Sequence, residues 1–165
     1  MALGSRRFGD LIPKKEHNKA ELFFHRSFSW KSKAKFPFYK NIYGFDIIAH
    51  LDGFILFGGG YQESYFNKQQ KISGDIYFES SLTTKFTLKS NKRTKLGRLQ
   101  LKRVGHSVIE INKKILVIGG KNNKSTEICE LNNIRIICSL RKPVLNNFCY
   151  YPALVIVYSD TAKYC

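Results

Sequence analysis

The apolar residues of the chain occur in short runs and not at helical spacing. The runs at 54–57, 115–118 and 153–158 are rich in β-branched or aromatic side chains, and several end in glycine or in polar residues. Runs of this length and composition predict strands that are buried on both faces. Segments 75–79 and 126–131 also have the length of a strand. The pattern therefore predicts an all-β, antiparallel fold.

An internal repeat underlies this pattern. Segment 44–59 aligns without a gap to segment 105–120, at an offset of 61 residues (105 − 44 at the first glycine and 119 − 58 at the double glycine). Each copy contains a strand, a tight polar turn, a second strand and a glycine pair, Gly58-Gly59 or Gly119-Gly120. Glycine at a strand end lets the backbone turn sharply or approach a neighbouring sheet where a side chain would collide.

Two further strands are expected after the glycine pair of each copy. In the first copy they are predicted at 75–79 and 85–88, and in the second at 126–131 and 134–138. Four antiparallel strands per repeat are typical of a propeller blade. The first copy has a much longer loop between its second and third strands than the second copy has.

These residues resemble the kelch repeats, which build β-propellers. The sequence Gly105-His106-Ser107, the apolar strand that closes in Gly119-Gly120 and the third strand at 126–131, which carries a Glu, are similar to the kelch pattern. Family blades also carry aromatic residues farther on. Trp30 resembles the aromatic residue of a preceding blade and Phe86 its counterpart in the next, whereas Ile136 or Ile137 stands at this place in the last full blade.

The resemblance covers about residues 22–158 and implies an organisation of the chain. Residues 1–21 are expected to form a basic, poorly ordered segment, and residues 22–165 a partial propeller. Its parts are predicted as a blade tail at 22–41, blades at 42–88 and 103–138, and the start of a further blade at 147–158. Four blades of about 50 residues need about 200, and the chain has 165. We therefore expect an incomplete propeller, a fragment of a longer protein or a chain that completes itself by association.

The charge of the chain is strongly positive. With 28 Lys and Arg against 12 Asp and Glu, the formal net charge is +16. Segment 80–109 contains no acidic residue, and we expect most of it to connect two blades. Such an excess attracts acidic proteins and, nonspecifically, nucleic-acid phosphates. The alternative is a solvated surface that keeps the chain soluble.

No catalytic, cofactor or metal site is predicted. Gly119-Gly120-Lys121 is followed by Asn122, where a phosphate-binding loop needs Ser or Thr. His106 and Ser107 are neighbours on a strand and therefore point to opposite faces, so they cannot form a catalytic pair, and we expect both to bond the backbone between blades. The histidines lack partners at metal-ligand spacing. We expect a protein that is not an enzyme, although propellers can host enzymes.

The cysteines and the apolar runs indicate where in the cell the protein is expected. Cys129, Cys138, Cys149 and Cys165 match neither a zinc-binding pattern nor a dense disulfide framework, so we expect reduced thiols. The N-terminus lacks the apolar region of a secretory signal, and the longest apolar run is too short to span a membrane. The prediction is an intracellular, cytoplasmic chain.

The family resemblance implies a protein-interaction module, for example the substrate-recognition part of an adaptor. In kelch proteins the loop after the second strand and the connections between blades share a face that binds partners. The residues nominated on this face are Tyr61, Tyr65, Phe66, Lys68, Lys71, Lys92, Arg93 and Lys95. We expect an acidic protein partner, with self-association through open blade edges as a further contact. The alternatives are a basic polyanion-binding or nucleic-acid-binding β domain, and a non-functional truncated propeller.

Overall fold

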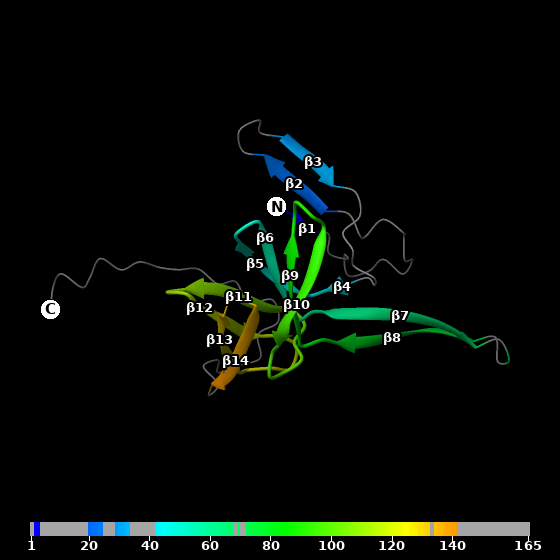
Figure 1. Cartoon of the computed structure of the whole chain (residues 1–165). Coiled ribbons are helices and arrows are strands. Elements are labelled where there is room, and N and C mark those ends of the chain that lie inside the picture. The colour runs from blue at the N-terminus through cyan, green and yellow to red at the C-terminus, as the bar shows by residue number, and fades with distance from the viewer. Residues whose placement is uncertain are drawn as a thin grey trace.

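The described parts of the chain form strands in antiparallel sheets, joined by turns, bends and short irregular segments (Figure 1). The computed structural model describes residues 2–3, 20–24, 29–33, 42–67, 69, 72–132 and 134–141. Within these residues no helix is present, and hence none that is long and apolar enough to cross a membrane. The predicted all-β, antiparallel fold is confirmed for this part of the chain. The segment 147–158, expected to begin a further blade, lies outside it.

Two four-stranded sheets, which we call sheet I and sheet II, contain the two copies of the repeat. The strands of sheet I, in the order β10-β9-β6-β5, are β5 (Asp46–His50), β6 (Gly53–Phe57), β9 (Leu82–Thr87) and β10 (Lys92–Arg98). The strands of sheet II, in the order β11-β12-β13-β14, are β11 (His106–Ile111), β12 (Lys114–Gly119), β13 (Thr126–Asn132) and β14 (Arg135–Arg141).

Two smaller sheets complete the described structure. In one, β4 (Ile42–Tyr43) pairs with β7 (Gly60–Asn67), which pairs with β8 (Ile72–Glu79). The hairpin β7–β8 extends away from sheets I and II (Figure 1). The other contains β1 (Ala2–Leu3), β2 (Ala20–Phe24) and β3 (Ser29–Lys33), with Trp30 in β3.

The strand assignment of the first repeat needs correction. Segment 75–79 belongs to β8 of the hairpin and not to the third strand of sheet I, which is β9. Phe86 therefore lies in the third strand, opposite Phe54, and the fourth strand is β10. Sheet I ends at Arg98 and not at residue 88, and segment 80–109 is largely β9 and β10 instead of a connection. The prediction failed because a strand-like sequence does not reveal its pairing partner.

The main hydrophobic core lies between sheets I and II. Ile55 and Phe57 of sheet I meet Val117 and Cys129 of sheet II, and the four side chains are completely buried. The other face of sheet I carries a second cluster of Phe54, Leu56 and Phe86, which are at most 5% exposed. Strand β6 thus buries both faces, which explains why its sequence is continuously apolar instead of alternating.

The tight polar turns predicted within each repeat are confirmed. Leu51, in the turn between β5 and β6, and Asn112 and Lys113, between β11 and β12, have positive φ angles. Two-residue hairpin turns favour this backbone because its twist matches that of the strands. At the first turn, Lys85 of the adjacent β9 forms an ion pair with Asp52 at 3.1 Å.

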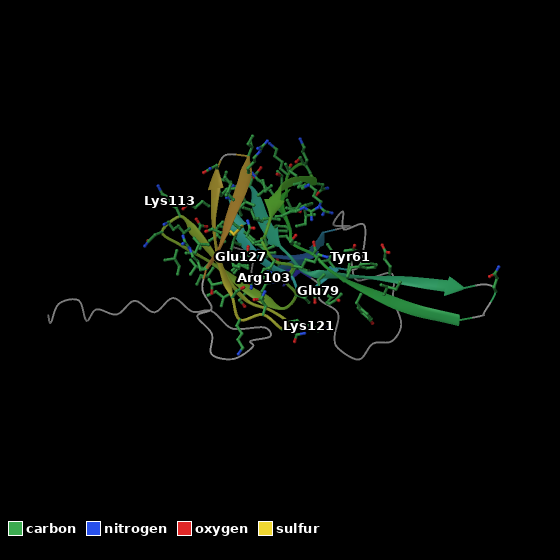
Figure 2. All side chains as sticks on the ribbon, turned by 90° about the horizontal axis from the view of Figure 1, so that it is seen from below. Tyr61, Glu79, Arg103, Lys113, Lys121 and Glu127 are labelled. Carbon is green, nitrogen blue, oxygen red and sulfur yellow. A yellow bond between two sulfur atoms is a disulfide. The ribbon has the colours of Figure 1, made fainter. Side chains whose placement is uncertain are left out.

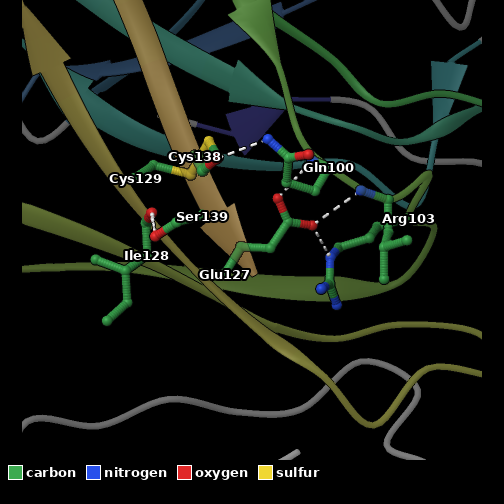
Figure 3. Close-up of a disulfide and its surroundings, with 8 residues drawn as sticks. Gln100, Arg103, Glu127, Ile128, Cys129, Cys138 and Ser139 are labelled. Atoms are coloured by element: carbon green, nitrogen blue, oxygen red, sulfur yellow. Dashed lines mark hydrogen bonds and ion pairs between the residues drawn. A yellow bond between two sulfur atoms is a disulfide. The ribbon is translucent and has the colours of Figure 1, made fainter. Parts of the chain in front are cut away.

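A disulfide joins Cys129 of β13 to Cys138 of β14, with an S–S distance of 2.07 Å (Figure 3). The two residues are direct partners across the strand pair, and their Cα atoms are 4.0 Å apart. The prediction of reduced thiols is therefore wrong for this pair, while Cys149 and Cys165 lie outside the described residues. Disulfides are rare in cytosolic proteins, so these two cysteines no longer argue for an intracellular location.

We predict that the disulfide contributes about 2–3 kcal/mol to the free energy of unfolding, because closing a loop of this size restricts the unfolded chain. The double variant Cys129→Ala/Cys138→Ala should lower that free energy by this amount in urea titrations. Dithiothreitol should lower it similarly in the wild type and leave the variant unchanged. Equal wild-type midpoints with and without the reductant would contradict the prediction.

Candidate functional site

The two glycine pairs occupy the same structural setting in both repeats. Gly59 and Gly120 have φ angles of +89° and +111°, and a Cβ atom on either would collide with or crowd its neighbours. Around Gly59 these neighbours are Ile42, Tyr43 and Phe45. Around Gly120 they are the residues 61 positions later, Arg103, Val104 and His106. The repeat is thus a repeat of three-dimensional contacts, and the interpretation of the glycine pairs as points of close backbone approach is confirmed.

The hairpin β7–β8 stands where the second repeat has a two-residue turn. In the second repeat, Lys121 and Asn122 are bridged by a hydrogen bond from the Asn123 N–H to the Gly120 carbonyl, at 3.1 Å. In the first repeat the Ser80 N–H donates to the Gly59 carbonyl at 2.8 Å, and residues 60–79 lie between them. The insertion therefore leaves the closing bond in place. The long loop predicted here is an ordered pair of strands.

The same turn is capped alike in both repeats. The Ser80 hydroxyl accepts a hydrogen bond from the Leu82 N–H, and the Asn123 side-chain carbonyl accepts one from the Ser125 N–H. Both are local side-chain caps of the kind that Ser and Asn favour in turns. They hold the start of the third strand, β9 or β13, in a fixed position relative to the glycine pair.

A buried ion pair lies at this end of sheet II. Arg103 Nε donates to Glu127 Oε1 at 3.0 Å, and both side chains have no exposure to solvent (Figures 2 and 3). The guanidinium also donates to the carbonyls of Gly119 and Ser125. The Glu127 carboxylate accepts two more hydrogen bonds, from the N–H groups of Gln100 and Leu101. These bonds satisfy the charges that burial removes from water.

The first repeat lacks both charges of this pair. The offset of 61 residues places Ile42 at the position of Arg103. Strand register places Thr84 at the position of Glu127, because Thr84 pairs with Leu56 as Glu127 pairs with Val117. Sheet I has a cavity of about 280 Å³ at this location, and both Ile42 and Thr84 line it.

Two of the nominated partner-binding residues meet at this cavity. Tyr61, at the base of the hairpin, and Arg93, on β10, both line it. Lys92 and Lys95 are exposed on the same strand as Arg93. Tyr65 and Phe66 lie farther along β7, and the structure describes the strand but not their side chains. Lys68 and Lys71 lie outside the described residues.

Sequence reasoning missed the buried members of the site. Arg103 belongs to the basic segment 80–109, which was expected to connect two blades, although its side chain is 1% exposed. Thr84 was not singled out at all. The available signal was the repeat itself, because the alignment places Arg103 over Ile42 and so marks a charge that only one copy carries.

His106 lies where sheet II meets the glycine pair of sheet I. A Cβ atom on Gly58 would be 2.8 Å from both the Arg103 carbonyl oxygen and Cε1 of the imidazole, and the φ angle of +54° also favours glycine here. Burial, followed by the positive charge of Arg103, lowers the pKa of His106 to about 4, with a smaller opposing effect from the main chain of Phe57. Within the described residues neither ring nitrogen makes a hydrogen bond of ordinary geometry, and the main chain of Phe57 is the group of sheet I that acts on the imidazole.

One group of potential metal ligands occurs among the described residues. The ligand atoms of Glu127, Cys129 and Cys138 lie within 4.8 Å of one another, and all three residues are buried. In this structure the two sulfur atoms are bonded to each other, and the carboxylate accepts three hydrogen bonds. With both sulfur atoms in a disulfide, neither cysteine offers a thiolate, and the carboxylate alone does not make a metal site.

Comparisons with known proteins place the chain in no family. No family model matches it, and no curated protein sequence matches it either. Among solved structures the chain is similar to the structure of YjhT, with 16% sequence identity and a TM-score of 0.49. The match covers 67% of this chain and 34% of that one. This chain thus matches about a third of the length of that structure.

The buried ion pair yields a prediction based on the first repeat. Arg103→Ile or Glu127→Thr alone should lower the free energy of unfolding by about 3–5 kcal/mol, because each leaves one buried charge unpaired. The double variant should cost clearly less than the sum of the two, since it recreates the uncharged arrangement of Ile42 and Thr84. Urea titrations of the four proteins give the coupling energy. Additive losses would show that the two side chains do not act as a pair.

A second prediction concerns the dependence of stability on pH. The pKa of His106 is about 4 in the folded chain and about 6.5 when unfolded, so protons bind the unfolded state first as the pH falls. The stabilisation is complete above pH 6.5 and is lost progressively down to pH 4, by about 3 kcal/mol in total. His106→Phe, which introduces the residue found at Phe45 of the first repeat, should remove this component. The free energy of unfolding is measured by urea titration at pH 7, 6 and 5. If it falls equally for wild type and variant, the prediction is refuted.

Proposed function

We propose that this chain is a protein-interaction module of the kelch-repeat type, an incomplete propeller that binds an acidic protein partner. The observation that carries the proposal is the hairpin β7–β8. It is inserted at the glycine end of sheet I without altering the hydrogen bond that closes the turn. Because sheet I keeps its strand pairing, the insertion adds a contact surface to a stable scaffold.

The arrangement of sheets I and II supports the scaffold part of the proposal. The face of sheet I that carries Ile55 and Phe57 packs on the face of sheet II that carries Val117. Both sheets have four strands in chain order once the hairpin is set aside, and the same contacts surround each glycine pair. Two adjacent propeller blades have this arrangement, with four strands each in the same order and face-to-face packing.

The charge around the base of the hairpin supports an acidic partner. Strand β10 presents Lys92, Lys95 and Arg98 to solvent, and Arg93 and Tyr61 line the adjacent cavity. Among the described residues, no carboxylate forms an ion pair with any of the four basic residues. Tyr and Arg are residue types that frequently anchor protein interfaces. The role in an adaptor, the absence of enzymatic activity and an intracellular location remain predictions from the sequence.

The same basic strand favours polyanion binding as a second candidate. Exposed lysines along one strand attract any phosphate backbone, but they provide no recognition of bases in themselves. The two functions differ in their dependence on salt and on the hairpin, so one experiment separates them.

We predict that the hairpin is needed for binding and not for folding. Replacing residues 60–79 by Lys-Asn, the turn of the second repeat, should leave the urea midpoint close to the wild-type value, because the Ser80–Gly59 bond is retained. It should weaken binding of a fluorescent decapeptide of alternating Glu and Gly by about tenfold or more in 150 mM salt. Fluorescence anisotropy measures the affinity.

A Gln-Gly decapeptide and a heparin fragment are the controls. The Gln-Gly peptide should not bind the wild type, because it lacks the negative charges. Equal affinity of wild type and hairpin variant for the acidic peptide would refute the proposed function. Heparin binding that persists at about 0.5 M salt would favour the polyanion alternative. Loss of heparin binding by about 0.2 M salt would indicate nonspecific electrostatic attraction.

A further inference from the structure

We infer that the cavity at the base of the hairpin is a pocket for a carboxylate side chain, Glu or Asp, of a partner protein. This inference rests on the proposed function and names the chemical group that the site recognises. It follows from a comparison of the cavity with the equivalent position in the second repeat.

The second repeat fills this position with its own side chains. The Arg103 guanidinium reaches the carbonyls of Gly119 and Ser125 and the Glu127 carboxylate. The residues at the corresponding positions of the first repeat are Gly58, Leu82 and Thr84, and all three line the cavity. Ile42, at the position of Arg103, has a short apolar side chain that cannot reach them as a guanidinium does. The cavity of the first repeat therefore occupies the place that an internal ion pair fills in the second.

The walls of the cavity combine a cation with an unpaired hydroxyl. Arg93 lies opposite Phe86 across the β9–β10 pair, and Lys95 lies opposite Thr84. Since residues that pair across two strands share one face of the sheet, both cations lie on the face of Thr84. Thr84 is 5% exposed, and its buried hydroxyl has no hydrogen-bond partner among the described residues. An unpaired polar atom at such a depth is costly unless a ligand bonds it.

These groups match a carboxylate better than a cation or a phosphate. Thr84 replaces Glu127, so a carboxylate from outside would supply the negative charge that the second repeat carries itself, with Arg93 as its partner. A cationic ligand would be repelled by Arg93. The side chains of Ile42, Leu56 and Leu82 form an apolar part of the lining, which accommodates the methylene groups of Glu but offers nothing to a fully hydrated phosphate.

The test follows the acidic Glu-Gly decapeptide by NMR on the full chain. In ¹H–¹⁵N spectra the peptide should shift the amide signals of Gly58, Gly59 and Gly60, which line the cavity. Arg93→Met should weaken binding by about tenfold or more, because a charge-assisted hydrogen bond is lost. Thr84→Val, which keeps the shape and removes the hydroxyl, should weaken it about threefold or more. The urea midpoint of each variant verifies that it is folded.

Lys89→Met is the matched control, because it removes one positive charge from the exposed turn between β9 and β10. It should change the affinity less than twofold. If Arg93→Met and Lys89→Met weaken binding equally, or the amide shifts avoid the glycines, the pocket is refuted while the proposed function stands. If the peptide does not bind the wild type in 150 mM salt, both are refuted.

Discussion

The close approach of the Gly58-Gly59 backbone to the segment that enters sheet II determines how the two repeats are joined. The Gly59 N–H donates to the Arg103 carbonyl at 2.8 Å, and the imidazole of His106 lies against Gly58. A side chain at Gly58 would collide with both of these groups. On the same strand, directly before Gly58, Ile55 and Phe57 meet Val117 and Cys129 in the core. A main-chain contact that tolerates no Cβ atom at Gly58 thus joins the two repeats between the core residue Phe57 and the hairpin, which begins at Gly60.

The two repeats differ in the groups that they bury beside the glycine pair. Sheet II places opposite charges side by side and surrounds them with main-chain bonds, so that Arg103 and Glu127 are both satisfied without water. Sheet I has neither charge, and it contains a cavity with Thr84 on its wall and Arg93 beside it. The hairpin β7–β8 belongs to the first repeat, the one with the cavity. Insertion and cavity lie together because residue 60, the first of the insertion, follows directly on the glycine pair.

The two misassignments made from sequence have a common physical cause. Segment 75–79 and β9 are both apolar enough to be strands, and Cys129 and Cys138 are separated by a turn of ordinary length. Hydrogen bonds decide which strands pair and in which register. These bonds join residues that are not neighbours in the sequence, either in distant segments or on the two sides of a turn. Composition therefore identified one strand of the hairpin, at 75–79, but neither its partner β7 nor its place outside sheet I, and it could not show that the two cysteines face each other.

The sequence by itself determined the all-β character, the 61-residue repeat and the need for glycine at both strand ends. These features depend on local backbone preference and on the apolar pattern, which any reader of the chain can follow. Only the tertiary structure decided that Arg103 is buried, that the hairpin leaves sheet I intact, and that Tyr61 and Arg93 line one cavity. Each of these depends on which side chains the packing of two sheets brings together, and burial and distance between such residues are not encoded in any local segment.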